Sequence, residues 1–364
     1  MKLRKKYLFV TNQFQTGGVE TVFHNLTKNV DIEALLFPVH LNVDAKLIDE
    51  LPDNVTLVKN RYKIQRSIFG LIKVIYAGIK YRKTYQKKDL QVINFSDTLT
   101  TLLFSYILNP KAAISWIHCN PEALLNVRTH CLYWWLLKRC QRIVFISQSQ
   151  RKLFFSMDES RGIDTKKAVV CTDFIDSDVT KKIAQEISIK GSYFFTAARL
   201  DLRSKDYITL IKAYSSLPSN IRNKYQLLIA GDGPDRNVIE RKIRELRLQD
   251  RILLLGNVSN PFTYMAKASV FIHASISEGF AMSILEALAC GATVVASDCH
   301  VGPSEILGNG KYGYLYMPGN CEALTKKISE ALETPISSDL AKKRAKEITK
   351  LGIEQAKELL ENAE

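Results

Sequence analysis

Two carboxylates, Glu278 and Glu286, stand eight residues apart in the second half of the chain. Carboxylate oxygens accept hydrogen bonds from hydroxyl groups, which a hexose and a ribose both carry. A helix predicted to begin between them would offer unpaired backbone N–H groups, which bind phosphate at a helix N-terminus. The pair therefore predicts a ligand that combines sugar, phosphate and ribose. Two solvated surface glutamates are the alternative.

The residues around this pair predict one strand–loop–helix–strand unit of a parallel sheet. Val270–Ala274 is a short apolar run typical of a buried strand, and Met282–Ala289 has apolar residues at helical spacing. Gly291 ends the predicted helix, and Thr293–Ala296 predicts the next buried strand. Open parallel sheets bind ligands beyond the carboxyl ends of their strands, which is where Glu278 falls.

Two cations follow another predicted strand, Ser192–Ala198. Arg199 comes directly after it and Lys205 one loop later. An arginine can bind a phosphate through two parallel hydrogen bonds and a lysine adds a point charge, so the two suit a diphosphate. Arg203 lies between them and competes with Lys205 for that role. Two ordinary surface cations are the alternative.

Composition narrows the class of protein. The chain has 364 residues, enough for two domains, and 46% of them are hydrophobic. Its seven cysteines form no C-x-x-C pair, which argues against structural zinc or a disulfide framework and indicates a reducing compartment. We expect a cytoplasmic protein, since the basic N-terminus has too short an apolar run for a signal peptide and no stretch suits a membrane span.

The basic excess lies in the first half of the chain. Residues 1–180 hold 26 Lys and Arg against 16 Asp and Glu, and residues 61–88 hold nine such cations and no acid. Isoleucines within 61–88 recur on one helical stripe, with Arg66, Lys73 and Lys80 opposite. This pattern predicts attachment to an anionic membrane surface on its inner face, or else a core-facing helix with a solvated basic face. Nucleic acid is not expected, because no motif interleaves aromatic residues with the cations.

The first half also offers polar residues at the ends of predicted strands. Gly17 and Gly18 follow the strand Lys6–Thr11 and precede a helix, so they could let a ligand approach the backbone or simply form a tight turn. His118 ends the strand Ala112–Ile117, which is a position for a site residue, although a lone histidine is often structural. The helical residues 132–142 form either a second interfacial patch or a helix packed on the sheet.

The stretch from Ser277 to Asp298 resembles the donor-site signature of glycosyltransferase family 4, with E-G-F, L-E-A and G-x-x-V-V-A-S in register. The resemblance covers nearly the full chain and is most specific from Arg199 to Glu305. It implies an α/β protein of GT-B fold, with two doubly wound Rossmann-like domains facing a central cleft. Residues 1–173 would form the acceptor domain, 174–190 a linker and 191–345 the nucleotide-sugar donor domain. Residues 346–364 would form a helix that crosses back to the first domain.

The resemblance also assigns roles to residues. It implies catalytic roles for Glu278, Arg199, Lys205 and His118, with Glu278 on the hexose hydroxyls and Glu286 on the ribose. Further donor contacts are implied for Gly17, Gly18, Gly231, Gly256, Asn257, Val258, Gly279, Phe280, Ala281, Met282, Ser283, Ile284 and Leu285. No metal and no cofactor are expected, and Asp176-Ser177-Asp178 is discounted as a metal motif because it lies in the predicted linker.

The activity that follows is retaining, metal-independent transfer of a sugar from a nucleotide diphosphosugar, expected to be a UDP-sugar. The expected acceptor is a hydroxyl of a saccharide or lipid-linked saccharide in bacterial surface polysaccharide or lipopolysaccharide assembly. Two alternatives stay open at this point: another GT-B enzyme such as a nucleotide-sugar epimerase, and a donor-binding partner subunit without activity.

Overall fold

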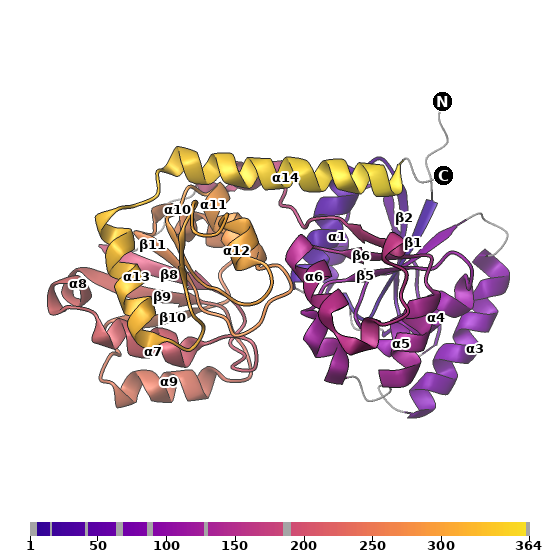
Figure 1. Ribbon diagram of the computed structural model, residues 1–364, viewed down its shortest axis with the longest axis horizontal. Helices are drawn as coiled ribbons and strands as arrows, with labels where there is room; N and C mark the ends of the chain where they lie inside the picture. The colour runs from indigo at the N-terminus through magenta and orange to yellow at the C-terminus, as the bar shows by residue number, and fades with distance from the viewer. Residues whose placement is uncertain are drawn as a thin grey trace. The chain divides into compact units, whose positions relative to one another are not determined.

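We describe the protein from a computed structural model of the chain (Figure 1), which describes residues 6–14, 17–40, 43–62, 68–85, 90–126, 130–184 and 191–361. The chain divides into two compact units. The first unit is Met1–Phe174 with Lys350–Glu364, and the second is Ile175–Thr349.

Within the described residues, the first unit holds a seven-stranded parallel sheet in the order β3-β2-β1-β4-β5-β6-β7. Most of its strands are short apolar runs with few exposed side chains, as expected where helices cover both faces of a parallel sheet. They are β1 (Lys6–Thr11), β2 (Glu33–Pro38), β3 (Val55–Leu57), β4 (Gln91–Asn94), β5 (Ile114–Ile117), β6 (Arg142–Phe145) and β7 (Ala168–Val170). The strand order reverses between β1 and β4, which is the point where open parallel sheets bind ligands.

Helices and 3-10 turns connect these strands. The described α-helices of this unit are α1 (Gly18–Asn29), α2 (Ala45–Asp49), α3 (Ile68–Tyr85), α4 (Leu99–Leu108), α5 (His130–Arg139) and α6 (Gln148–Ser156). The 3-10 turns are η1 (Pro121–Asn126), η2 (Asp158–Ser160) and η3 (Thr165–Lys167). Helix α5 packs on the rest of the unit through Tyr133 and Trp134, which are buried, while Trp135 is exposed.

The second unit has a parallel sheet of six strands among the described residues, in the order β10-β9-β8-β11-β12-β13. They are β8 (Ser192–Ala197), β9 (Tyr225–Ala230), β10 (Ile252–Gly256), β11 (Val270–His273), β12 (Val294–Ser297) and β13 (Tyr314–Tyr316). Its helices are α7 (Tyr207–Ser216), α8 (Ser219–Lys224), α9 (Arg236–Glu245), α10 (Pro261–Lys267), α11 (Met282–Ala289), α12 (Pro303–Ile306), α13 (Cys321–Glu333) and α14 (Ser338–Leu360).

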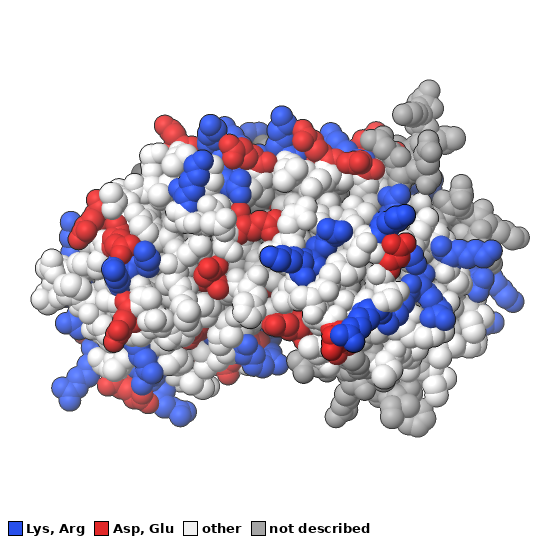
Figure 2. Space-filling view, in the orientation of Figure 1, with Lys and Arg blue, Asp and Glu red and all other residues white. Residues whose placement is uncertain are grey.

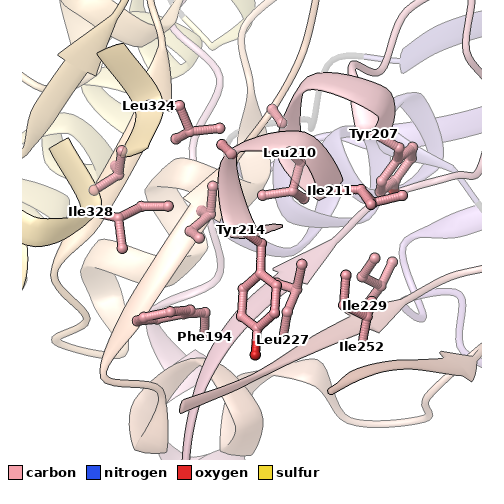
Figure 3. Close-up of a cluster of buried hydrophobic side chains, with 14 of the residues drawn as sticks. Phe194, Tyr207, Leu210, Ile211, Tyr214, Leu227, Ile229, Ile252, Leu324 and Ile328 are labelled. Carbon is pink, nitrogen blue, oxygen red and sulfur yellow. The ribbon is translucent and has the colours of Figure 1, made fainter. Parts of the chain in front are cut away.

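A single apolar cluster fixes α7 and α13 to one face of this sheet (Figure 3). Leu210 and Tyr214 of α7 meet Phe194 of β8 and Leu227 of β9, and Leu324 and Ile328 of α13 join them. This packing holds the end of β8 and the start of α7 in place, and the loop between them carries Arg199 and Lys205.

Two connecting segments differ from a simple linker. Residues 174–190 were expected to be one, yet Ser177–Ala184 form a 3-10 helix, η4, that packs against α10 and α11 and buries Val179. Residues 185–190 lie outside the described part of the chain. Helix α14 begins in the second unit and, from Lys350 on, belongs to the first.

The strand and helix pattern confirms the predicted α/β class with two doubly wound, Rossmann-like units. Among the described residues, the helices are all too short or too polar to cross a membrane.

Candidate active site

The site of the second unit lies where its strand order reverses, between β8 and β11. The loop after β8 brings Lys205 beside the loop after β11, where backbone hydrogen bonds join Asp206 N to Ala274 O (3.0 Å) and Ile276 N to Ser204 O (2.8 Å). Open parallel sheets bind ligands at this point. The Lys205 ammonium and the Glu278 carboxylate, 73 residues apart in sequence, form an ion pair here.

Glu278 is held by a small polar network. Its Oε1 atom accepts hydrogen bonds from Lys205, from the Ser275 hydroxyl (2.7 Å) and from Nε2 of His273 (3.0 Å). In the described part of the chain, all the hydrogen bonds to this carboxylate reach Oε1, which leaves Oε2 open to a ligand hydroxyl. The carboxylate is therefore oriented on one oxygen and available on the other.

His273 is buried and its tautomer follows from its neighbours. Nε2 faces the carboxylate of Glu278 and so carries the proton, while Nδ1 lies 3.5 Å from the Ser297 hydroxyl and accepts from it. Ser297 in turn accepts a hydrogen bond from the backbone N–H of Ser275 (2.9 Å). Residues at the ends of β11 and β12 thus fix the orientation of Glu278.

The charges in this network are set by burial and pairing. Burial raises the pKa of Glu278, but Lys205 and the hydrogen bond from His273 outweigh it, so the pKa lies well below its ordinary value. Burial lowers the pKa of His273, and the Glu278 carboxylate opposes this only in part. At neutral pH Glu278 is therefore an ionised carboxylate and His273 a neutral imidazole.

The other two predicted cations are arranged differently from Lys205. Arg199 is exposed directly after β8. Arg203 forms a salt bridge with Asp201 (2.6 Å), and 83% of its side chain is exposed. Lys205 alone of the three joins Glu278, so geometry favours Lys205 over Arg203 as the second cation of the site.

The first turn of α11 begins at the same edge of the sheet. Its N-cap residue, Ala281, has φ +77° and makes no side-chain cap. Ile284 N donates to the Ala281 carbonyl oxygen (2.9 Å), so the N–H groups of Met282 and Ser283 are the donors that this helix N-terminus offers to an anion. The backbone of Gly302 packs closely against the loop before α11. An added Cβ at Gly302 would lie 2.1 Å from the Phe280 carbonyl oxygen. Glycine at 302, with φ +98°, is required by this close approach.

The remaining predicted donor residues lie on α11, where Ile284 and Leu285 are fully buried, or at the ends of neighbouring strands. Glu286 is half-buried one turn into α11. Gly231 and Gly256, after β9 and β10, are joined by a hydrogen bond from Gly231 N to Gly256 O (2.7 Å), and Asn257 and Val258 continue the second loop. These residues share the carboxyl edge of the sheet with Lys205 and Glu278.

A separate polar centre lies at the switch point of the first unit. The carboxylate of Asp97, after β4, accepts hydrogen bonds from the backbone N–H groups of His118 (3.0 Å) and Cys119 (2.8 Å). Gln150 of α6 donates to the carbonyl oxygens of Ile117 (3.1 Å) and Cys119 (2.8 Å). The Asp97 carboxylate and the Gln150 amide therefore both hold the loop that carries His118 in place.

The His118 imidazole is packed among aromatic rings. It stacks 6.1 Å from Trp116 and contacts Phe95 edge-on at 4.4 Å. Both ring nitrogens are buried and, within the described residues, have no hydrogen-bond partner. Burial lowers the pKa of His118 to about 3 and raises that of Asp97 to about 6. Burying imidazole nitrogens without a hydrogen-bond partner destabilises the fold. These nitrogens are therefore candidates for ligand contact.

Gly17 and Gly18 begin α1 after β1 in the same unit, with Gly17 as an extended N-cap that makes no side-chain hydrogen bond. Gln15 and Thr16 of this loop lie outside the described residues. The loops after β1 and β4 meet where Asn12 N donates to the Ser96 hydroxyl (3.0 Å).

Sequence reasoning missed the residues that support the site. His273, Ser275, Ser297 and Asp97 are polar residues at or just after the ends of buried strands. Their position at strand ends could have identified them, because the same position identified His118 and Arg199 as site candidates.

Residues 179–349 match the model of the family described as glycosyl transferases group 1. The chain is a glycosyltransferase. It is 26% identical, over 93% of its length and 94% of the relative, to the N-acetylgalactosamine-N,N'-diacetylbacillosaminyl-diphospho-undecaprenol 4-alpha-N-acetylgalactosaminyltransferase of Campylobacter jejuni subsp. jejuni serotype O:2. The predicted enzyme class is thereby confirmed.

Solved structures of other glycosyltransferases share the fold. HepE of Anabaena in complex with UDP and glucose superposes with a TM-score of 0.77 at 19% identity, over 99% of each chain. The lipopolysaccharide outer core galactosyltransferase WaaB gives a TM-score of 0.74 at 19% identity, over 98% of this chain and 99% of WaaB. These likenesses confirm the GT-B type of fold predicted from the glutamate motif.

Proposed function

We propose that this glycosyltransferase moves a sugar from a UDP-sugar to a hydroxyl of a lipid-linked saccharide, with retention of the anomeric configuration and without a metal ion. The observation that carries the proposal is the ion pair between Lys205 and Glu278 at the switch point between β8 and β11. The oriented carboxylate of Glu278 could bind sugar hydroxyls, and the cations and the helix N–H groups beside it could bind a diphosphate.

Charge at the site supports the donor half of the proposal. As the bond from the sugar to the diphosphate breaks, negative charge grows on the leaving phosphate oxygens. Arg199, Lys205 and the first backbone N–H groups of α11 are positioned to stabilise that charge, and fixed donors of this kind supply most of the rate in such reactions. These groups could stabilise the diphosphate without a metal ion, and that supports metal independence.

The same groups suit a reaction with retention. The acceptor hydroxyl attacks the anomeric carbon on the face from which the diphosphate departs, and a leaving phosphate oxygen takes the hydroxyl proton. Glu278 is held by Lys205 and ionised, so it suits hydrogen bonding to hydroxyls better than proton transfer. His118 of the first unit is our candidate for a further contact with the sugar.

The comparisons support the choice of substrates. The name of the Campylobacter jejuni relative states an acceptor on diphospho-undecaprenol and an alpha-N-acetylgalactosaminyl group, and HepE was solved with UDP. WaaB and the lipopolysaccharide 1,6-galactosyltransferase of Escherichia coli strain K12, which is 34% identical over 28% of this chain, act on lipopolysaccharide by their names. We therefore place the reaction in the assembly of a bacterial surface polysaccharide.

The test is an assay of the purified enzyme with a panel of UDP-sugars and a short-chain polyprenyl diphosphosaccharide, in EDTA. We expect one UDP-sugar to be consumed, with a product one sugar heavier and an anomeric proton signal of the donor's configuration. Inverted product would contradict retention, and activity that returns only with added Mg²⁺ or Mn²⁺ would contradict metal independence. Transfer from GDP-sugars alone would overturn the choice of nucleotide.

A further inference from the structure

Helix α3 of the first unit packs on the core through one of its faces. Val74 and Ala77 are fully buried, and Gly78 lies so close to α4 that an added Cβ would be 2.9 Å from the Ile107 side chain. The helix therefore packs on α4 through a face made of small and branched residues. Tyr81 and Tyr85 also pack against this core, and Leu71 packs against a neighbouring cluster, but four further apolar residues of the helix do not.

Those other apolar residues form an exposed stripe along the helix. They recur at i, i+3, i+4 and i+7, which aligns them on one face. They are Ile72 (60% exposed), Ile75 (40%), Tyr76 (53%) and Ile79 (51%). The prediction of a core-facing isoleucine stripe is therefore wrong for these positions, because the smaller residues at 74, 77 and 78 take the contact with α4. Ile64 of the predicted stripe and Arg66, which was predicted opposite it, lie outside the described residues.

Cations surround the stripe. Lys73 and Lys80 are exposed on its flanks, Arg82 and Lys83 follow towards the end of the helix, and Ile68–Tyr85 contains no acidic residue. The Lys80 ammonium lies 5.5 Å from the centre of the Tyr76 ring. Figure 2 shows blue and white atoms over α3 in this view, with no red among them.

We propose that α3 lies in the interface of an anionic phospholipid bilayer, with the Ile72–Ile79 stripe inserted between headgroups and the lysines on lipid phosphates. An exposed apolar stripe flanked by lysines and an interfacial tyrosine is what such a surface binds. The acid-free charge pattern favours a negatively charged surface over a neutral one. This inference does not depend on the donor site.

The test is flotation of the full-length protein with vesicles of phosphatidylcholine alone and with added phosphatidylglycerol. We expect binding to the anionic vesicles only. The triple variant Ile72→Ser, Ile75→Ser, Ile79→Ser should lower that binding at least about tenfold, because the inserted apolar area is lost. Lys73→Gln and Lys80→Gln should each lower it about fivefold at low salt.

A matched control uses exposed apolar residues elsewhere. Val238→Ser, Met317→Ser and Leu351→Ser change side chains that are 41%, 71% and 48% exposed, and this triple variant should bind vesicles as the wild type does. Both triple variants should keep the wild-type thermal midpoint, since neither alters a core residue. Unchanged flotation of the α3 variant, equal loss in the control, or wild-type binding to neutral vesicles alone would each overturn the proposal.

Discussion

At the scale of single residues, the site separates two cations that look alike in sequence. Lys205 joins the Glu278 carboxylate in a network that also holds Ser275, whereas the exposed Arg203 side chain pairs with the buried Asp201. Both follow the same strand within four positions of each other, so spacing could not choose between them. The choice depends on the loop after β11, which is far away in sequence.

Replacing Lys205 with glutamine should therefore lower kcat/KM by at least about a hundredfold, since a fixed cation near the leaving phosphate and the partner of Glu278 are lost together. The matched variant Arg203→Gln should stay within about twofold, because its side chain is exposed and away from Glu278. Steady-state kinetics with saturating acceptor measures both. Equal losses in the two variants would show that the geometry misassigns the pair.

Asp97 and His118 should affect the pH dependence of stability in opposite directions. His118 has a pKa near 3 in the fold against about 6.5 unfolded, so the unfolded chain binds more protons and His118 costs stability as pH falls below 6.5. Asp97 has a pKa near 6 in the fold against about 4 unfolded, so it costs stability as pH rises from 4 to 6. Between pH 4 and 6 the two slopes nearly cancel.

Single substitutions should expose each slope. Asp97→Asn should leave stability rising with pH by about 1.4 kcal/mol per unit between pH 4 and 6, and His118→Phe should leave it falling by a similar amount relative to wild type. Urea unfolding at several pH values measures the difference. Parallel curves for wild type and both variants would contradict the proposed burial of these groups.

Among the structural elements, the conformation of the loop before α11 depends on Gly302, whose backbone packs against it. Gly302→Ala would place a methyl group against the Phe280 carbonyl oxygen, so we expect a loss of about 1–3 kcal/mol in the free energy of unfolding and a raised donor KM. Gly319→Ala is the control, because Gly319 also has positive φ (+77°) but an added Cβ meets nothing within 4 Å. Thermal unfolding and kinetics compare them; equal destabilisation would mean that the backbone angle, not the contact, matters.

The sequence could predict the elements of the second unit closely, and the structure has the expected helix Met282–Ala289. Short apolar runs bounded by glycines predict strands reliably when each strand is buried on both faces. The orientation of α3 could not be predicted the same way. This helix carries apolar residues around most of its circumference, so periodicity finds a stripe but does not say whether Val74 or Ile75 faces α4.

At the scale of the whole molecule, the last helix belongs to both units in sequence and is fixed to the first by specific contacts. The Tyr7 hydroxyl donates to the Leu360 carbonyl oxygen (2.5 Å), and the Thr172 backbone N–H donates to the Gln355 side chain (2.9 Å). Gly352 packs so closely that an added Cβ would lie 2.4 Å from the Thr172 carbonyl oxygen. Sequence analysis predicted this return from family resemblance, but no periodic pattern could locate the contact at Gly352.

Gly352→Ala should consequently destabilise the protein by about 1–3 kcal/mol through overpacking, although alanine is the better helix former by about 1 kcal/mol. Gly18→Ala, at a helical position where an added Cβ meets nothing within 4 Å, should be neutral or slightly stabilising. Chemical denaturation of both variants measures this. A stabilised Gly352→Ala protein would mean that α14 does not contact the Thr172 backbone so closely.

Calorimetric titration of the protein with UDP in EDTA would show whether the switch point of the second unit holds a donor nucleotide without a metal ion. We predict that UDP binds without metal and more tightly than GDP or ADP. Binding should weaken at least about tenfold in Arg199→Gln and in Glu286→Ala, because the phosphate and the ribose of the ligand would each lose a charged hydrogen-bond partner, but not in Arg203→Gln. No heat with UDP in EDTA, or binding that is unchanged in Arg199→Gln and Glu286→Ala, would contradict the account.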